Sequence, residues 1–174
     1  MLENVFLNTA CDNALRSIAA GDKGALAVIY DKMHRQIYSA AWAVLNNCHD
    51  AEDALQNTLC EILVSAVAYE GPNAKAWIIS IARNQALNLL RKRKSEVFSP
   101  YEDEKASDFN VESEFIYLDA LSSLGERERE AVILKIYCKM KHKEIAELLG
   151  ITPSASEKLY QRGLLKLRKY YKGG

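Results

Sequence analysis

The stretch WIISIARNQALNLLRKRK, residues 77–94, decides the fold of the chain around it. At about 3.6 residues per turn its apolar side chains fall on one stripe, which predicts an amphipathic helix packed on a core. The stripe consists of Ile78, Ile81, Ala82, Ala86, Leu89 and Leu90. The helix ends in four consecutive cations, residues 91–94, which the negative end of a helix dipole favours.

Another face of this helix carries an indole, two carboxamides and a guanidinium. Its members are Trp77, Ser80, Asn84, Leu87, Asn88 and Arg91. Such groups stack on bases, hydrogen-bond to base edges and neutralise phosphates, so this face is a candidate nucleic-acid surface. The alternative is an ordinary amphipathic helix with a solvated polar face. Trp77 itself fits either base stacking or the core.

The composition indicates a soluble, all-helical protein. The 174 residues are 49% hydrophobic and 26% charged, and they include only eight Gly and three Pro. No apolar run approaches the roughly 18 residues that span a bilayer, and the N-terminus does not resemble a secretory signal. We therefore expect a cytoplasmic protein with no membrane partner.

The four cysteines form no CxxC pair, so neither a disulfide framework nor a structural zinc site is indicated. One cluster, formed by Cys48, His49, Glu52 and Asp53, could supply metal ligands, and a small metalloenzyme built on it is one alternative function. A polar helix start accounts for the same residues. We expect no metal and no other cofactor.

Charge is strongly segregated along the chain, although the net formal charge is zero. Residues 83–94 hold five bases and no acid, and residues 131–174 hold ten bases and three acids. Residues 95–112 hold six acids and one base. Two basic segments separated by an acidic one indicate a protein that grips a polyanion at two places.

Further helices are predicted before the opening stretch. Apolar periodicity gives helices over residues 9–20 and 24–45, and Asp50 begins another after the break at Asn46 and Asn47. The buried stripe of that third helix is expected to contain Leu55, Leu59, Ile62, Leu63, Ala66 and Val67. Its outward face carries Glu52, Asp53, Gln56 and Asn57. An acidic face of this kind suits a basic partner, and it equally suits a solvated helix start.

Residues 95–112 predict an acidic, flexible linker, because they carry an acidic cluster and no helical stripe. The linker would join a small helical bundle of residues 1–94 to a second small helical domain of residues 113–174. In the second domain, a helix over residues 126–139 is expected to bury three side chains. These are Ile133, Ile136 and Tyr137.

The sharpest local signal lies near the C-terminus. A short helix over residues 143–149, a turn at Gly150, a cap at Thr152 and Pro153 at the first helical position give helix-turn-helix spacing. In such a motif the second helix enters the major groove by its N-terminal turns. The side chains exposed there would be Ser154, Ala155, Glu157, Lys158, Gln161 and Arg162. A plain helical hairpin with a basic end is the alternative.

The whole chain resembles the sigma-70 family of bacterial RNA polymerase initiation factors, specifically the small extracytoplasmic-function (ECF) type. The motifs that agree, in order, are DAEDALQ at 50–56, the helix at 77–94, LSSLGEREREAVILK at 121–135 and KEIAELLGITPSASEKLYQRGLLKLRK at 143–169. They resemble the polymerase-binding segment, the helix that reads and melts the promoter −10 element, and the domain that reads the −35 element. The resemblance implies a non-enzymatic subunit that binds core RNA polymerase and directs promoter recognition, DNA melting and transcription initiation.

The resemblance also implies roles for individual residues. Polymerase binding would involve Asp50, Glu52, Asp53 and Gln56. Contacts with the −10 element would involve Tyr69, Trp77, Arg83, Asn84, Asn88, Arg91 and Arg93. Contacts with the −35 element would involve Ser154, Ala155, Glu157, Lys158, Gln161, Arg162 and Lys166. The turn over residues 69–74 would lie where the family captures a flipped base, with Tyr69 and Trp77 as stacking candidates.

The implied partners are core RNA polymerase, promoter DNA and, by kinship, an anti-sigma protein; no small-molecule substrate is expected. The chain departs from the commonest family pattern at Ser156, Glu157 and Leu159, and Lys141 replaces the usual small capping residue. We interpret these changes as altered promoter preference, in which Glu157 can accept from cytosine N4. A polymerase-independent helix-turn-helix regulator is the alternative function, although it leaves DAEDALQ and the basic helix unused.

Overall fold

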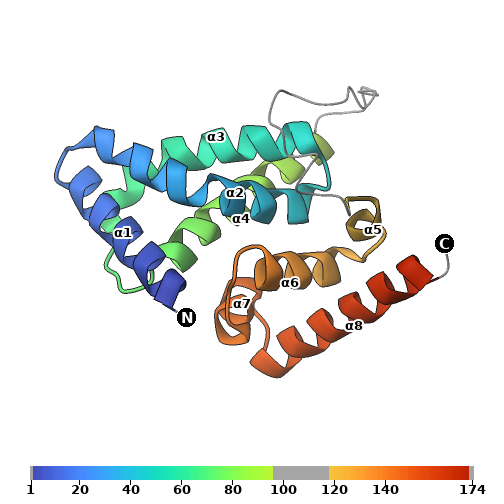
Figure 1. The fold of residues 1–174 in the computed structure, drawn as a ribbon. Helices are drawn as coiled ribbons and strands as arrows, with labels where there is room; N and C mark the ends of the chain where they lie inside the picture. The colour runs from blue at the N-terminus through green and yellow to red at the C-terminus, as the bar shows by residue number, and fades with distance from the viewer. Residues whose placement is uncertain (1, 96–117, 173–174) are drawn as a thin grey trace.

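The computed structural model describes residues 2–95 and 118–172, and every regular element within those ranges is a helix (Figure 1). In chain order the elements are α1 (Leu2–Ala19), η1 (Lys23–Ala25), α2 (Leu26–Leu45), α3 (Cys48–Ser65), η2 (Ala66–Ala68), α4 (Ala74–Ser95), α5 (Leu118–Ser122), α6 (Glu126–Ile136), α7 (His142–Leu149) and α8 (Pro153–Lys172). Helices α1–α4 form one bundle, and α5–α8 form a second group beside it. The predicted all-helical fold is confirmed. In the described part of the chain, no helix is long and apolar enough to cross a membrane.

The predicted linker, residues 95–112, lies almost entirely outside the described residues. Helix α4 ends at Ser95, and the described chain resumes at Leu118. The proposed boundaries of the two domains, residues 1–94 and 113–174, therefore stay predictions.

Helix α2 is the centre of the molecule. Its residues 37–45 are all buried, so this part of the helix meets other elements on every side. A helix that is apolar all round belongs in a core. Accordingly, α2 contacts α1, α3 and α4 of its own bundle and α6 of the second group. Figure 1 shows α6 between this bundle and α8.

The apolar core is continuous between the two groups of helices. One cluster joins side chains of α1, α2, α3 and α4 to Leu134, Cys138, Met140, Ile145 and Leu149 of the second group. Another joins side chains of α2, α3 and α4 to Leu121, Leu124, Val132 and Ile133. Removal of apolar surface from water stabilises such contacts by about 25 cal/mol per Å². We infer that apolar burial is the main attraction between the two groups.

Polar contacts also cross between the groups. Arg129 of α6 is buried, and its Nε donates to the main-chain oxygen of Ala43 in α2 at 2.8 Å. Asn73, just before α4, donates from Nδ2 to Glu144 Oε1 of α7 at 2.7 Å. The same Asn73 caps α4, because its Oδ1 accepts from the Ala76 N–H at 3.2 Å. Buried polar groups at the contact are thus hydrogen-bonded, as stable packing requires.

Two of the predicted helices begin earlier than the sequence signals indicate. Helix α1 starts at Leu2, well before residue 9. Helix α3 starts at Cys48, and the cap is Asn47, whose Oδ1 accepts from the Asp50 N–H at 2.9 Å. Asp50 therefore lies within the first turn of α3, where the helix dipole favours a carboxylate.

Two side chains that were predicted to be buried are exposed. Val67 is 74% exposed, because α3 ends at Ser65 and the following 3₁₀ turn changes the helical phase. Ile136 is 42% exposed, because it is the last residue of α6 and the chain then turns through Lys139 with a φ of 52°. The apolar period of the sequence thus runs past the end of α3 at Val67 and to the very end of α6 at Ile136.

Candidate nucleic-acid interface

Helix α4 has one face in the core and another in solvent, as its sequence predicts. The buried side chains of the predicted stripe are Ile78, Ile81, Ala82 and Ala86, and Leu89 and Leu90 are half-buried. Asn84, Asn88 and Arg91 are exposed, and Arg91 Nη1 donates to Asn88 Oδ1 at 3.4 Å. Two carboxamides and a guanidinium therefore lie together on one accessible face.

Arg83 does not lie on that exposed face. Its Nε donates to Glu130 Oε2 of α6 at 2.6 Å, and its Nη2 donates to Glu130 Oε1 at 3.4 Å. The side chains of Arg83 and Glu130 are 16% and 2% exposed. A two-point pair of this kind fixes both the distance and the angle between its partners. In this arrangement Arg83 therefore binds the second group of helices.

The start of α4 is covered by the second group as well. Lys75 is 5% exposed, and its Nζ donates to the main-chain oxygen of Lys139 at 3.0 Å. Burial lowers the pKa of Lys75. The Glu144 carboxylate accepts from Asn73 at 2.7 Å and from the Lys141 N–H at 2.6 Å. Glu144 thus accepts from the free N–H at the start of α7, so this helix start is hydrogen-bonded without a small capping residue at position 141.

Asp50 and Arg93, which were predicted to serve different partners, pair with each other. Arg93 Nη1 lies 2.5 Å from Asp50 Oδ2. Asp50 is only 7% exposed, and burial raises the pKa of its carboxyl while the Arg93 guanidinium opposes that shift. The pair connects the first turn of α3 to the last turns of α4, so Asp50 is mainly an internal contact.

The other members of the predicted polymerase-binding face are accessible. Glu52 and Asp53 are half-buried, and Gln56 is exposed. Burial raises the pKa of Glu52. His49 Nε2 lies 4.0 Å from Asp53 Oδ2, along the same side of α3. No group of three or more His, Cys, Asp or Glu that could hold a metal ion occurs among the described residues.

Tyr69 and Trp77, the two aromatic residues near the turn before α4, lie against each other. Their ring centroids are 5.3 Å apart, and the ring planes are inclined at 57°. Both rings are half-buried against the larger core cluster. Tyr69 Oη donates to Asp12 Oδ1 of α1 at 2.8 Å. Burial and this hydrogen bond raise the pKa of Tyr69 to about 12. Trp77 therefore contacts the core on one side and the turn on the other.

Helices α7 and α8 form the predicted helix-turn-helix. Gly150 ends α7 at a φ of 64°, and Pro153 begins α8. Thr152 caps α8, because its Oγ1 accepts from the Ala155 N–H at 3.1 Å. Of the predicted −35 residues in the first turns, Ala155 is half-buried, whereas the exposed ones are Ser154, Glu157, Lys158, Gln161 and Arg162.

Two residues of α8 are engaged inside this group of helices. Ser156 is fully buried, and its Oγ lies 3.0 Å from His142 Nδ1 of α7. A small hydroxyl side chain therefore fits the contact between the two helices of the motif. Lys166 is exposed, but its Nζ donates to Glu128 Oε2 of α6 at 2.6 Å.

Sequence reasoning missed Glu130 and Asp12, which hold Arg83 and Tyr69. A signal for Glu130 exists, because it shares a helical face with Ile133 and Leu134, and a carboxylate within an apolar stripe usually has a partner. Asp12 carries no comparable signal, since a carboxylate on a helix surface is ordinary.

Two family models match this chain. The model for sigma-70 region 2 matches residues 29–96, and the model for sigma-70 region 4 matches residues 114–167. CarQ, an RNA polymerase sigma factor of Myxococcus xanthus, is 34% identical over 127 residues, covering 68% of this chain and 73% of CarQ. SigE, an ECF RNA polymerase sigma factor of Mycolicibacterium smegmatis, is 30% identical over 169 residues, covering 87% of this chain. The chain belongs to the ECF-type sigma-70 family.

As a member of this family, the sigma factor is non-enzymatic and directs RNA polymerase in promoter recognition and transcription initiation. It spans 65% of the length of SigE. Its fold is similar to that of the sigma factor RpoE, solved in complex with the anti-sigma factor NepR from Bartonella quintana. The TM-score is 0.67 at 23% identity, and the match covers 82% of this chain and 94% of RpoE.

Proposed function

We propose that this sigma factor contacts the −10 element through the exposed face of α4. The observation that carries the proposal is that Asn84, Asn88 and Arg91 are exposed together while the opposite face of α4 is buried. Carboxamides hydrogen-bond to base edges, and a guanidinium can neutralise phosphate or bond to guanine. A face fixed rigidly by its buried side would present these groups in one orientation.

We propose that the turn over residues 69–74 captures a flipped base of the −10 element. Tyr69 and Trp77 supply two aromatic rings beside that turn, with their centroids 5.3 Å apart. Base–aromatic stacking contributes about 1–3 kcal/mol per base, which can offset the few kcal/mol that unstacking costs. The core contacts of Trp77 support a role as the fixed wall of such a site.

For the −35 element, we propose that the first turns of α8 enter the major groove. Gln161 is suited to adenine, Glu157 to cytosine N4, and Lys158 and Arg162 to phosphates. Ser154 and Ala155 would approach the groove at the helix start. Lys166 would reach phosphate only by leaving Glu128, to which it is bound at 2.6 Å.

For core polymerase, we propose the acidic face of α3 as the contact surface, with Glu52, Asp53 and Gln56 as its members. The resemblance to the family implies docking on the clamp helices of the β′ subunit. Asp50 would support this face without contacting polymerase, since its carboxylate pairs with Arg93 of α4. Contacts with polymerase and with the −10 element would thereby share one structural support.

In the arrangement described, the second group of helices occupies residues that we propose for DNA contact. Arg83 is paired with Glu130, and Asn73 in the capture turn is bound to Glu144. Full use of the −10 surface therefore requires the two groups to separate. We propose that this separation occurs on core polymerase in the cytoplasm. We also propose that an anti-sigma protein can hold the closed arrangement, in which the two groups of helices are packed together. The likeness to RpoE, which was solved with an anti-sigma factor, supports this second proposal.

The test is initiation by core RNA polymerase carrying this sigma factor on a genomic template library. We expect promoter-dependent transcripts that are absent with core alone. The double variant Asn84→Ala with Arg91→Ala should open the −10 element less well and bind core normally. A matched control replaces an exposed amide and an exposed cation elsewhere, Asn13→Ala with Lys32→Ala.

Equal loss of core binding in the α4 variant would mean that this face docks on polymerase. Absence of initiation above core alone, together with tight operator binding by the free protein, would favour a polymerase-independent regulator.

A further inference from the structure

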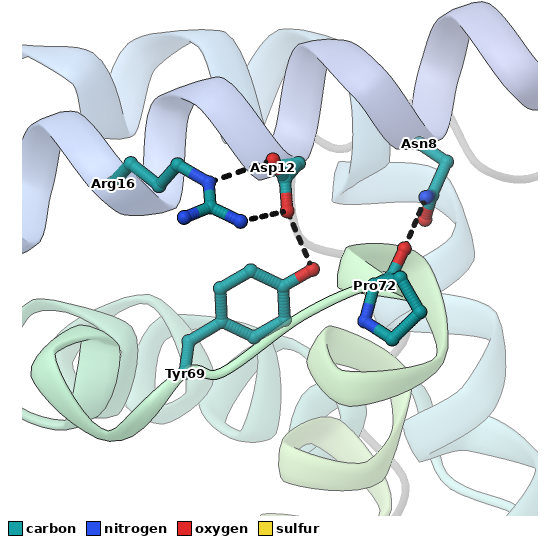
Figure 2. A network of polar contacts seen from close by, with 5 residues as sticks. All are labelled: Asn8, Asp12, Arg16, Tyr69 and Pro72. Carbon is teal, nitrogen blue, oxygen red and sulfur yellow. Dashed lines mark hydrogen bonds and ion pairs between the residues drawn. The ribbon is translucent and has the colours of Figure 1, made fainter.

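One side of α1 carries a polar stripe that contacts the turn before α4. Asn8, Asp12 and Arg16 are four residues apart in succession, so they lie on the same side of the helix. Figure 2 shows Asp12 directed toward Tyr69, Asn8 directed toward Pro72, and Arg16 directed toward Asp12. The stripe therefore faces the turn that we propose for base capture.

Asp12 is the centre of this stripe. It accepts from Tyr69 Oη at 2.8 Å through Oδ1, and from Arg16 Nε at 2.9 Å through Oδ2 (Figure 2). Arg16 also donates from Nη2 to Asp12 Oδ1, at 3.5 Å. The bonds from Arg16 and Tyr69 lower the pKa of Asp12. Asp12 is thus a charged acceptor at neutral pH, and hydrogen bonds to charged groups are stronger than neutral ones.

Asn8 holds the other end of the turn. Its Nδ2 donates to the main-chain oxygen of Pro72 at 2.9 Å, and its Oδ1 accepts from the Lys75 N–H at 3.1 Å. Between these points, Gly71 has a φ of 69°, and a Cβ built there would lie 3.4 Å from Arg16 Nη2. The turn is therefore tied to α1 at both ends and approached closely in the middle.

The helix that makes these contacts precedes the part of the chain matched by the region 2 model. That match begins at residue 29, whereas α1 spans Leu2–Ala19. The turn itself lies within the matched residues. A segment outside the matched region thus shapes a turn inside it.

We propose that Asp12 and Arg16 are positioning residues for base capture, in which Asp12 orients the Tyr69 ring beside Trp77 and Arg16 orients Asp12. The proposal rests on the proposed role of the turn. A Tyr69 ring that is free to rotate would present its stacking face only part of the time, and a site that is formed only part of the time binds more weakly in proportion. Asn8 supports the same geometry through the main chain.

The test uses holoenzyme assembled from core RNA polymerase and the full chain, on a promoter template whose −10 element is randomised. Base preference at each −10 position is read from the transcripts. We expect Tyr69→Phe, which keeps the ring and removes the hydroxyl, to weaken preference at one position roughly tenfold, the order of a hydrogen bond to a charged group. Asp12→Ala should weaken the same position, and the double variant should be no worse than Asp12→Ala.

The matched control is Thr9→Ala, which removes from α1 a hydroxyl that donates to Val5 O at 2.9 Å. It should leave every preference unchanged. A folded Tyr69→Phe chain with wild-type preference at all positions would overturn the positioning role alone, as would a uniform loss of initiation with unchanged preferences. A wild-type holoenzyme with no preference at any −10 position would instead overturn base capture itself, and the positioning role with it.

Discussion

Arg83 of α4 and Glu130 of α6 form a two-point ion pair that joins the two groups of helices, with Nε 2.6 Å from Oε2. Glu130 is 2% exposed and Arg83 is 16% exposed, so water screens the pair only weakly. The carboxylate occupies two nitrogens of this guanidinium and leaves the Arg83 side chain little exposed. The proposed contact between Arg83 and DNA therefore competes with the closed arrangement.

Replacing Glu130 by Gln should loosen the closed arrangement and release Arg83. Removal of one charge from a buried pair costs several kcal/mol, and the cost here falls on the contact between the two groups. We expect the free chain to bind a single-stranded −10 oligonucleotide roughly tenfold more tightly, because the competing carboxylate is gone. Fluorescence anisotropy measures the affinity, and small-angle scattering measures the radius of gyration, which should increase.

Glu147→Gln is the matched control for this prediction. Glu147 is exposed on α7 of the second group and is not among the residues proposed for contact with DNA. Its replacement removes the same charge without touching the contact between the groups. If both variants gained affinity equally, the cause would be the lost negative charge and not the release of Arg83.

Gly163 of α8 should not tolerate a methyl group. A Cβ there would lie 2.5 Å from Val132 Cγ2 and 3.4 Å from Glu128 O, at the crossing of α6 and α8. Overpacking costs about 1–3 kcal/mol, against about 1 kcal/mol gained from the better helix propensity of Ala. We expect Gly163→Ala to lower the free energy of unfolding by up to about 2 kcal/mol, as measured by urea denaturation.

Removing the obstructing methyl groups should reverse that effect. In a Val132→Ala background, the added Cβ has room, and Gly163→Ala should become neutral or stabilising. An undiminished penalty in that background would locate the strain in the main chain of α6 and not in Val132.

Asp50 predicts a pH dependence of stability. Its folded-state pKa is raised by burial, so the folded state holds this proton over a pH range in which the unfolded state, with a pKa of about 3.9, has lost it. Stability then falls as the pH rises through that range. Relative to Asp50→Asn, the wild type should lose stability from about pH 4 up to the folded-state pKa and remain level above it. Urea denaturation over a pH series measures the free energy of unfolding of the wild type and of Asp50→Asn. If the two free energies changed in parallel with pH, Asp50 would have an ordinary pKa.

Glu157 should set base preference in the −35 element. It is exposed in the first turns of α8, where its carboxylate can accept from cytosine N4. Glu157→Gln should redistribute preference at one base pair by about 1–3 kcal/mol, whereas Arg162→Ala should weaken binding for all sequences and reduce its salt dependence. Selection from a randomised −35 library compares the two variants. Identical profiles before and after the Glu157 change would remove its reading role.

Apolar period and turn residues were sufficient to predict most of the fold. The buried face of α4 and the turn at Gly150 followed by the Thr152 cap are where the sequence indicates. Such features depend on residues close together in the chain, so local rules capture them. The predicted burial of Val67 and Ile136 was wrong, because periodicity alone does not show where a helix ends.

The candidate site was less predictable than the fold. The exposure of Asn84 follows from its position on α4. The ion pair between Arg83 and Glu130, by contrast, depends on how the two groups of helices dock. The pairing of Asp50 with Arg93 likewise joins residues far apart in the chain. Charged residues whose partners come from distant segments carry no local signature of that partner.

The two hydrogen bonds of the Asn73 side chain affect how fast the two groups of helices can separate. One end of its amide caps α4 and the other end binds Glu144, so separation of the two groups breaks only the second bond. The freed Nδ2 and Oε1 can be hydrated at once, and the first turn of α4 keeps its cap. Opening at this point leaves the cap of α4 intact, so the barrier to opening reflects wetting of the shared core and rupture of the buried polar contacts, such as Arg83 with Glu130 and Arg129 with the Ala43 oxygen.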